Sequence, residues 1–565
     1  MPSSADADNE AVDNEAIPES INNATSSAIY PDYSEKNHDA KSLSSQQSTT
    51  SLSDPATSGS NEKDDLESGS KPAPAESQKA KPPGHTIVLM PLTDLDRGIV
   101  GWDSPEDPKN PKNWKPSRKW RTMAPVALST LLLPLGSTLF APGVGLVAAE
   151  FHEYNTTILS FMVSIFVLGF GWGPIIFHAP LSELYGRKIV IAISNLMYMC
   201  FNFGCAWSTG TNMFLAMRFL GGLLGCASMV VGGGVISDMF DREQMGRASS
   251  FYALGPLLGP IIGPVIGGWI AQDLGWRWAF RFLIILSGAM VVAFAVIAEE
   301  THVPALLRKK TAIMKKELGR EDLICATDEF NKRTPRMIFF VGITRPLVLL
   351  TTNPVSMFLG FYMAVAFSFL YIFLTTISTV FKELYGFSTG TTGLAYLGLG
   401  VGLMATLFVI GRTNDSMVAY LTRKNNGVRE PEFRLRPLFV SCIMLPVSMF
   451  WYGWAVQSHA HWFAVVASMF PLGVGMVSTM FPIQTYLIEV FAPYGLSASA
   501  NAAGNCFRMT AGAFFPLVAP SLFNRLDYGW GCSLLAFLAL ALCGSMAITF
   551  SYYGKKFREK FPPKT

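Results

Sequence analysis

Charged side chains inside long apolar segments are the residues of this sequence that could do chemistry. Arg218 begins the run Arg218-Phe219-Leu220-Gly221-Gly222, and Arg508 lies in a second apolar run near the end of the chain. An arginine at the centre of a membrane helix costs roughly 2.5–3.5 kcal/mol on insertion scales, so it is interpreted as functional. We expect Arg218 to face an internal cavity and to take part in proton coupling. The alternative is that its guanidinium extends to the outer interface.

A second set of charges lies where apolar segments end. Glu183 and Arg187 are four residues apart, and Asp238 ends a later apolar segment. Charges at such a boundary can form a latch, with Glu183 facing the positive N-terminus of a later helix near Ser497. The alternative is ordinary basic flanking of a membrane segment, which does not explain the carboxylate. Arg218 and Asp238 are about 30 Å apart along a helix, so they do not form a pair.

Several chemistries receive no support from the sequence. No carboxylate lies near the middle of an apolar segment, so a proton could be handled by Asp238, Glu183 or His178. No Gly-x-x-x-x-Gly-Lys-Ser/Thr loop is present, and we expect no ATP hydrolysis and no enzyme activity. The eight cysteines lie mostly in apolar segments without metal spacing, so neither a metal nor another cofactor is expected. The net charge of +3 does not favour a nucleic-acid partner.

The composition identifies the elements that must position these residues. The chain of 565 residues is 50% hydrophobic and 15% charged, unlike a soluble domain. Residues 1–115 are polar and lack periodicity, which predicts a disordered tail, and no signal peptide opens the chain, so the tail is expected to be cytosolic. Apolar runs follow, each near the roughly 20 residues of a spanning helix, and backbone groups in hydrocarbon must pair internally. The predicted fold class is an all-α polytopic membrane protein with twelve transmembrane helices, over residues 124–149, 157–178, 189–208, 213–236, 248–271, 279–298, 355–380, 391–411, 437–457, 461–485, 496–523 and 529–552.

The spans fall into two groups of six. We expect an N-terminal half over residues 116–298, a cytosolic central loop over 299–350, a C-terminal half over 351–553 and a cytosolic tail over 554–565. Basic residues are concentrated in alternate connections, which places that side and both termini in the cytosol. The residues concerned include Arg187, Lys188, Arg242, Arg247, Arg308, Lys309, Lys310, Arg423, Lys424 and Arg429.

The first loop on the other side contains a glycosylation sequon. Asn155-Thr156-Thr157 has the required pattern and lies on the side where a sugar could be added. The alternative is that this loop is too close to the membrane to be modified.

Three motifs in order give the chain a resemblance to a known family. Trp102-Asp103-Ser104-Pro105-Glu106-Asp107-Pro108-Lys109-Asn110-Pro111-Lys112-Asn113-Trp114 precedes the first span, and Ala179-Pro180-Leu181-Ser182-Glu183-Leu184-Tyr185-Gly186-Arg187-Lys188 follows the second. The fifth span carries Gly255-Pro256-Leu257-Leu258-Gly259-Pro260-Ile261-Ile262-Gly263-Pro264-Val265-Ile266-Gly267-Gly268. Over about 100–555 the sequence resembles the twelve-helix drug:proton antiporters of the major facilitator superfamily, specifically the fungal multidrug and secondary-metabolite exporters. Ala179 stands where that family often has glycine.

The resemblance implies the major facilitator fold and a set of site residues. It implies a cytosolic gate made by Glu183, Arg187, Lys188 and Asp238. Arg218 matches the fourth-helix motif of the superfamily, and Asn505 and Arg508 are expected to line the cavity. The resemblance also implies an antiporter motif, for which the alternative is a general small-residue packing face. The motif residues are Gly255, Pro256, Gly259, Pro260, Gly263, Pro264, Gly267 and Gly268.

Polar and aromatic residues of the later spans are candidates for contact with cargo. They could stack on an amphipathic molecule and form hydrogen bonds with it. Packing between helices is the alternative for each of them. The candidates are Tyr362, Tyr371, Gln484, Tyr486 and Phe507.

The expected function is proton-coupled export of small amphipathic organic compounds across the plasma membrane, by alternating access. The expected partners are the cargo, protons and the lipid bilayer, and the protein is expected to be a monomer. A proton-coupled importer of a small organic solute or polyamine is the alternative within the same fold. A membrane receptor or a membrane-embedded enzyme is the alternative from another class. Twelve spans do not fit a receptor of seven helices, and no cluster of His, Cys and Asp residues resembles a catalytic site of an enzyme.

Overall fold

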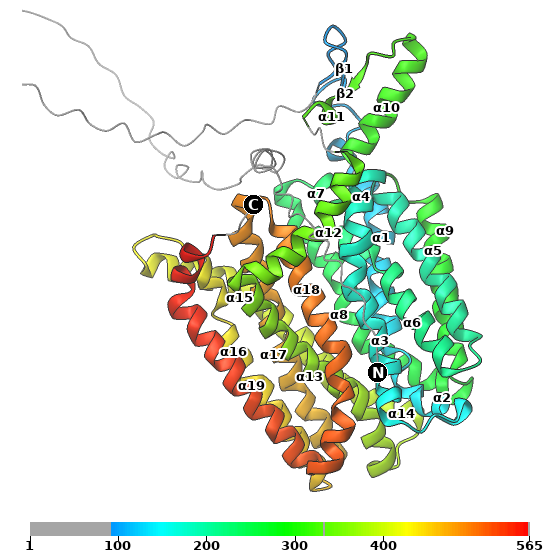
Figure 1. Ribbon diagram of the computed structural model, residues 1–565, viewed down its shortest axis with the longest axis vertical. Coiled ribbons are helices and arrows are strands. Elements are labelled where there is room, and N and C mark those ends of the chain that lie inside the picture. Colours follow the sequence, from blue (N-terminus) through cyan, green and yellow to red (C-terminus); the bar gives the residue numbers. More distant parts are fainter. Residues whose placement is uncertain (1–91, 331–333, 563–565) are drawn as a thin grey trace, which may run out of the picture. The chain divides into compact units, whose positions relative to one another are not determined.

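The structure is a computed structural model, and it describes residues 92–330 and 334–562 (Figure 1). Helices make up nearly all of the described chain, with a small pair of strands, β1 (Ile99–Val100) and β2 (Ile324–Cys325). The predicted fold class, an all-α polytopic membrane protein, is confirmed. The disordered tail is expected over residues 1–115, and its first 91 residues lie outside the described residues.

The N-terminal half contains six membrane spans. Proline and glycine divide some of these spans into two helices, because proline lacks the amide donor that a helix interior requires. A five-residue π-helix, Pro174–His178, joins α3 to α4. The helices are α1 (Pro116–Thr138), α2 (Val144–Phe151), α3 (Thr156–Gly173), α4 (Ala179–Tyr185), α5 (Arg187–Ala206), α6 (Thr211–Gly225), α7 (Ala227–Met239), α8 (Arg242–Asp273) and α9 (Arg277–Val296).

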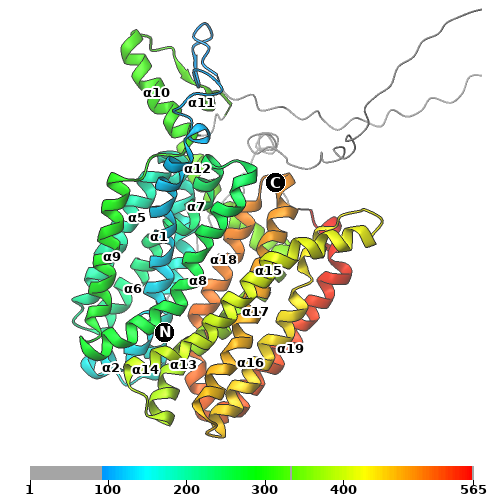
Figure 2. The ribbon, with the colours of Figure 1, turned by 180° about the vertical axis from the view of Figure 1, so that it is seen from behind.

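The C-terminal half follows the same plan. Its helices are α13 (Pro354–Tyr385), α14 (Thr389–Thr392), α15 (Leu397–Lys424), α16 (Leu438–Gln457), α17 (Trp462–Phe491), α18 (Ser497–Phe514) and α19 (Ala519–Lys560). A 3₁₀ turn, η5 (Gly393–Tyr396), joins α14 to α15, and α19 contains a kink at Asp527. Figures 1 and 2 show the two halves side by side, with α3, α8, α13 and α18 where they meet.

Eleven helical segments of the described chain are long and apolar enough to cross a membrane. Helix α18 is not among them, because Ser497, Asn501, Asn505 and Arg508 reduce its apolar content. It nevertheless packs against α13, α17 and α3 in the place of a span. With α18 included, the structure contains the twelve spans that the sequence predicts.

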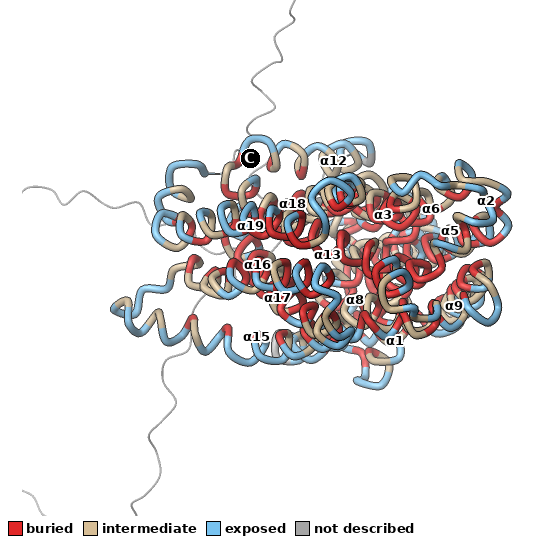
Figure 3. Tube along the Cα trace, turned by 90° about the horizontal axis from the view of Figure 1, so that it is seen from below, coloured by how far each residue is buried: buried red, intermediate tan, exposed pale blue. Residues whose placement is uncertain are grey.

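Apolar side chains on the outer faces of the helices remain exposed, as a lipid environment requires. Val296 on α9 is 78% exposed and Phe408 on α15 is 68% exposed. Buried residues instead lie on the faces where helices meet, as the burial colours of Figure 3 show. This reversal of the usual surface composition is the property of a chain that lies in a bilayer.

The two ends of the helix bundle differ. We call the end with the start of α1, the start of α5 and the connection between the halves the linker side, and the end with α2 and α14 the far side (Figure 1). Contacts between the halves at the far side join α8 to α14 and η5. Near the middle, Ser164 of α3 donates to the carbonyl of Ala513 of α18 at 2.7 Å.

The expectation of disorder up to residue 115 is wrong for residues 92–115. Strand β1 pairs in parallel with β2 of the central connection, and Trp102 is 2% exposed against Leu307 and Cys325. Lys310 Nζ donates to the carbonyl of Gly101 at 2.7 Å. No periodic signal marks residues 92–115 in the sequence, because their buried contacts are with a segment about two hundred residues away, outside the reach of local patterns.

The central connection is a folded element rather than a loop. It contains α10 (Val303–Leu318), β2, α11 (Ala326–Phe330) and α12 (Pro335–Thr352). The tail expected from residue 554 is also helical as far as Lys560. Helix α15, expected to end at 411, continues to Lys424, because the first left-handed residues after it are Asn426 and Gly427.

Candidate functional site

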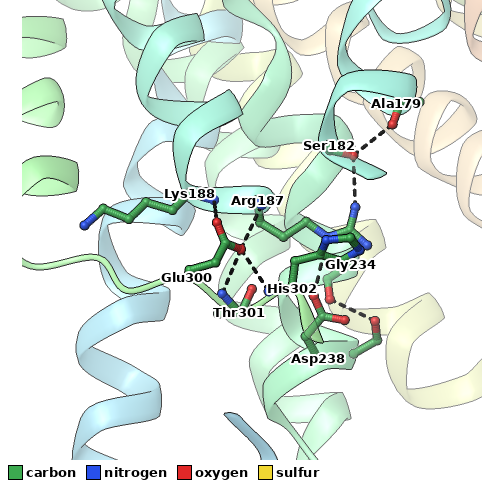
Figure 4. A network of polar contacts seen from close by, with 10 residues as sticks. Ala179, Ser182, Arg187, Lys188, Gly234, Asp238, Glu300, Thr301 and His302 are labelled. Atoms are coloured by element: carbon green, nitrogen blue, oxygen red, sulfur yellow. Dashed lines mark hydrogen bonds and ion pairs between the residues drawn. The ribbon is translucent and has the colours of Figure 1, made fainter. Parts of the chain in front are cut away.

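A charged network lies at the linker side of the N-terminal half (Figure 4). Arg187, the first residue of α5, donates from Nε to Asp238 Oδ2 at 3.4 Å and from Nη1 to Ser182 Oγ at 2.9 Å. The guanidinium lies over Gly234, where a Cβ would be 3.1 Å from it. Arg187 therefore joins α4, α5 and α7, and its role with Asp238 in a cytosolic gate stays a prediction.

Glu300 completes this network and was not predicted from the sequence. Its carboxylate accepts the backbone N–H groups of Arg187, Lys188, Thr301 and His302 at 2.8–3.0 Å. The first two belong to the start of α5, where amide donors have no helical partner and the helix dipole favours an anion. The signal that could have identified it is an acidic residue directly after the sixth apolar span.

Two members of the predicted gate take other positions. Glu183 is exposed and forms no ion pair with any described residue. Ser497 Oγ donates instead to the carbonyl of Ile488 at 2.9 Å, so the expected contact between Glu183 and the start of α18 is wrong for this structure. Lys188 enters the network through its backbone, and its side chain points away from Asp238 in Figure 4. The reason is helical phase, since Ser182 occupies the buried face of α4 next to Glu183.

We expect a double-mutant cycle on Arg187→Gln and Asp238→Asn to give a coupling energy of about 1 kcal/mol or more. Both side chains are largely buried, 12% and 18% exposed, so removing one partner leaves the other without compensation. The measurement is thermal unfolding of the purified protein and its single and double variants. The exposed pair Arg320 and Asp322 is the control and should couple less strongly. Additive effects for Arg187 and Asp238 would contradict the assignment.

His302 lies two residues after Glu300 and makes the stability of this network depend on pH. Burial, together with nearby Arg187 and Arg308, lowers the pKa of His302 to about 3. An unfolded histidine titrates near 6.5, so below that pH the unfolded chain binds more protons than the folded one. The stabilisation is complete above about pH 6.5 and decreases as the pH falls toward 3.

We therefore expect acidification from pH 6.5 to 5 to destabilise the wild type more than a His302→Gln variant. The difference is at most about 1.4 kcal/mol for each pH unit. Thermal unfolding of both proteins at several pH values measures it. Identical pH dependence in the two proteins would show that His302 titrates alike in the folded and the unfolded chain, and would contradict the prediction.

Arg218 lies inside the N-terminal half, and the prediction that it faces a cavity is wrong. It is 2% exposed, and its guanidinium donates to the carbonyls of Gly136, Ser137, Met162 and Val163 at 2.8–3.4 Å. The rings of Phe140, Phe166 and Phe280 surround it at 4.9–5.8 Å. Helix carbonyls have a spare lone pair, so α1 and α3 can satisfy a buried cation without a carboxylate. The alternative, extension to the outer interface, is not observed either; its part in proton coupling stays a prediction.

Arg508 of α18 is half-buried and lies between three helices of the C-terminal half. Its Nε donates to Asn505 Oδ1 at 2.9 Å, and Nη1 lies 3.3 Å from Met480 Sδ on α17. The guanidinium is also 4.7 Å from the ring centre of Phe367 on α13. No described carboxylate forms an ion pair with it. Its donors are therefore held by weak acceptors and are available to a stronger one.

The aromatic candidates for cargo contact divide into two groups. Tyr362 and Tyr486 are fully buried in the core of the C-terminal half, so their prediction as lining residues is wrong. Tyr371 is buried where the halves meet, near Ser137 of α1, and its contact with cargo stays a prediction. The Tyr362 hydroxyl donates to the carbonyl of Leu438, and that of Tyr486 to Glu432. Gln484 and Phe507 are half-buried, and their contact with cargo stays a prediction. Tyr362 and Tyr486 therefore pack between helices, which was the alternative interpretation, and each hydroxyl group forms a hydrogen bond.

The glycines of the motif in α8 form one face that packs against α1. A Cβ at Gly259 would be 2.5 Å from Pro134 Cβ, and Cβ atoms at Gly255, Gly263 and Gly267 would overlap α1. Thr138 Oγ1 donates to the Gly259 carbonyl at 3.3 Å across this contact. Glycines four residues apart thus allow two backbones to approach closely.

The far-side end of the same motif meets the other half. A Cβ at Gly268 would be 2.7 Å from the Thr389 carbonyl, and Gln272 Oε1 accepts the Gly390 amide at 2.9 Å. Gly393 of η5 lies against the Pro264 carbonyl. Because glycine on each partner allows this close approach, α8, α14 and η5 close the far side between the halves. The motif therefore has two faces, one for α1 and one for the C-terminal half.

The predicted glycosylation site at Asn155 lies in an exposed loop. Asn155 is exposed before α3, and its Oδ1 accepts the amide of Thr157 at 3.0 Å as a helix cap. Its glycosylation stays a prediction.

Within the described residues, no three His, Cys, Asp or Glu side chains gather as a metal site requires.

Two six-helix halves in a bilayer, closed against each other at one end by backbone contacts, define a multi-pass membrane transporter. Comparison with known proteins gives the family: the model of the Major Facilitator Superfamily matches residues 126–516. The chain belongs to this superfamily, so it is a transporter and not an enzyme.

Its relatives include fungal transporters of similar length. It is 42% identical over 463 residues to "MFS-type transporter penM" of Penicillium rubens, covering 82% of this chain and 90% of the relative. It is 39% identical over 475 residues to "Efflux pump radE" of Floropilus chiversii, covering 84% and 87%. Among solved structures, the partially occluded inward-open xylose transporter XylE of E. coli matches with a TM-score of 0.56 at 15% identity, over 79% of this chain and 98% of that one. The last likeness concerns the fold alone.

Proposed function

We propose that this transporter is an exporter of small amphipathic organic compounds, driven by protons that move in the opposite direction. The observation that carries the proposal is the glycine and proline face of α8, which packs on α1 and closes the far side against Gly390 and Gly393. Such a tight, backbone-to-backbone closure can separate as a unit when the halves rock. The relative named an efflux pump supports the direction of transport.

The two sides of the molecule alternate in access to the centre. In the described arrangement the far side is closed by α8, α14 and η5. Opening it requires loss of the Gln272 to Gly390 hydrogen bond and separation of the two glycine surfaces. The Arg187, Asp238 and Glu300 network holds α4, α5, α7 and the connection together at the linker side, so this end of the N-terminal half moves as one body.

The cargo site lies beside Arg508. Its cation, the amide of Asn505 and the thioether of Met480 provide a polar contact, and Phe367 provides an aromatic one. Half-buried Gln484 and Phe507 extend this surface. Such a mixture suits a molecule with an apolar body and a hydrogen-bond acceptor or an anionic group.

The linker side faces the cytosol, with both termini, and the protein works as a monomer in the plasma membrane. The basic residues of the linker side support this orientation. Asn155, near the far side, is then accessible to glycosylation. Loss of a glycosidase-sensitive mass in an Asn155→Gln variant tests this orientation.

The decisive experiment measures accumulation of 8-anilinonaphthalene-1-sulfonate, an amphipathic anion that suits the cation of Arg508, in cells that express the full chain. Expression should lower accumulation, and a protonophore should restore it. Dye accumulation that rises with expression and falls with the protonophore would mean proton-coupled import and would overturn the proposal. An Arg508→Gln variant at equal surface abundance is the negative control.

A further inference from the structure

His178 occupies an unusual position between two carbonyl oxygens. It ends the π-helix between α3 and α4 and is 3% exposed. Its Nδ1 is 3.0 Å from the Gly173 carbonyl oxygen, and its Nε2 is 3.1 Å from the Leu224 carbonyl oxygen. Both oxygens can only accept hydrogen bonds, so both ring nitrogens face acceptors.

Irregular helix geometry creates this position. Helix α6 ends at Gly225, and carbonyls of a last helical turn lack intrahelical donors, so Leu224 is free to accept from both Ser194 Oγ and His178. A Cβ at Gly173 would be 2.6 Å from Cys226 Sγ, so glycine there lets α3 approach the junction of α6 and α7. π-Helices are rare and frequently occur at functional sites.

A neutral ring satisfies only part of this geometry. With its proton on Nε2, His178 donates to Leu224, and its Nδ1 lone pair can accept the Cys226 thiol, which lies 3.4 Å away. The Gly173 oxygen then faces a lone pair at 3.0 Å. With protons on both nitrogens, the ring donates to both carbonyls, and the thiol of Cys226 can turn to the Leu223 carbonyl at 3.7 Å.

We propose that His178 is the proton-binding switch of the transport cycle, taking up one proton on Nδ1 while the Cys226 thiol keeps its own proton and changes acceptor. This inference rests on the proposed proton coupling and names the group that carries it. Each protonation state of His178 has hydrogen-bond partners within reach. The Cys226 thiol donates to Nδ1 when the ring is neutral and to the Leu223 carbonyl when the ring is charged. A histidine that serves only packing needs one tautomer and no such alternative.

The position of His178 connects proton uptake to the gate. Burial disfavours an imidazolium, and the two carbonyls favour it, so its charge depends on whether α3 and α6 keep their present contact. Helix α4 begins at the next residue and carries Ser182, which accepts from Arg187. Proton binding at His178 thereby stabilises the position of α4, whose Ser182 belongs to the linker-side network.

The charged groups of the surrounding elements make no hydrogen bond to the ring of His178 within the described chain. Cys226 is the titratable side chain in contact with the ring in the described part of the chain. The elements that pack against this π-helix and its neighbours carry Glu183 on α4, Arg187 and Lys188 on α5, Arg218 on α6, Asp238 on α7, Arg336 and Arg345 on α12 and Arg508 on α18.

Histidine NMR on the full chain in lipid nanodiscs tests proton binding without any cargo. With ¹⁵N-labelled histidine, the signal that is absent from a His178→Gln variant should change from one protonated nitrogen to two between pH 9 and 5. A signal that keeps a single neutral tautomer, or a fixed imidazolium, over this range would overturn the inference.

A Cys226→Ala variant tests the two-state geometry while leaving His178 in place. It removes the donor that satisfies Nδ1 in the neutral ring, so the midpoint of the titration should move to higher pH by about half a unit. An unchanged midpoint would overturn the alternation of the thiol. Because alanine is small and apolar, this variant is also the safer one for folding.

Transport in proteoliposomes distinguishes the inference from the proposed function. With the amphipathic anion 8-anilinonaphthalene-1-sulfonate as the probe, His178→Gln should lose at least about tenfold of gradient-driven movement and keep exchange without a gradient within about twofold. His459→Gln, in an exposed loop, is the control. Gradient-driven movement that persists in His178→Gln overturns the inference and leaves proton-driven export standing. A wild type that moves no dye counts against the proposed function, and the NMR titration then decides the inference.

Discussion

Replacing Arg508 with glutamine is expected to lower proton-driven export of an amphipathic dye by at least about tenfold. A charge-assisted hydrogen bond contributes about 1.5–3 kcal/mol, and each 1.4 kcal/mol corresponds to a factor of ten. Arg508 is half-buried, and within the described chain only an amide, a thioether and an aromatic ring hold it. Its donors therefore have much to gain from an acceptor on the cargo. Initial rates in proteoliposomes under a fixed pH gradient measure the effect.

Two variants make this result specific. Arg412 on α15 is exposed and lies over Phe408, so Arg412→Gln should retain wild-type rates. Arg508→Lys keeps the charge but loses the planar donor set, and its rate should lie between those of glutamine and the wild type. If Arg508→Gln exports the dye at the wild-type rate while dye still binds, the cargo site lies elsewhere between the halves.

Replacing Gly267 with alanine should be among the most destabilising single-methyl changes in the chain. A Cβ at Gly267 would overlap the Leu139 carbonyl of α1, and backbone cannot move aside as a flexible side chain can. Overpacking of this kind costs about 3 kcal/mol, so the apparent Tm of the purified protein should fall by about 3 °C. Thermal unfolding followed by size-exclusion chromatography measures it.

Gly246 provides a matched control in the same helix. A Cβ there would meet nothing within 4 Å, and alanine is the better helix former by about 1 kcal/mol. Gly246→Ala should therefore leave the Tm unchanged or raise it slightly. Equal losses in the two variants would mean that α8 tolerates alanine poorly in general, and that the contact between α1 and α8 is not the cause.

The membrane architecture is determined by the sequence itself. Long apolar runs must form helices in hydrocarbon, since every backbone amide and carbonyl needs a partner within its own segment. For the same reason the twelve spans and the two halves could be predicted, although the polar face of α18 hides it from a hydropathy test. The family motifs also marked Arg187, Asp238 and the glycines of α8 as residues in close contact.

Burial and partners were decided by the tertiary structure. The sequence shows that the residues around Arg218 are apolar. It does not show that four backbone carbonyls of α1 and α3 surround the guanidinium. Likewise, Tyr362 and Tyr486 could have faced the cargo path, and the rotation of their helices turned them into the core. Successive residues point about 100° apart around a helix axis, so a small rotation of the helix decides whether a side chain faces the core or the cargo path. In a mostly apolar helix the sequence does not reveal which face is buried.

The same limit explains what was missed. Glu300 acts on Arg187 through backbone amides more than a hundred residues away, and β1 pairs with β2 across more than two hundred, so no local pattern announces either contact. His178 became informative only when the π-helix and the end of α6 placed two carbonyls on its ring. Sequence by itself determined which segments span the membrane, because that depends on composition over about twenty residues. Which side chains meet depends on helix phase and on close backbone approach, and these are properties of the packed structure alone.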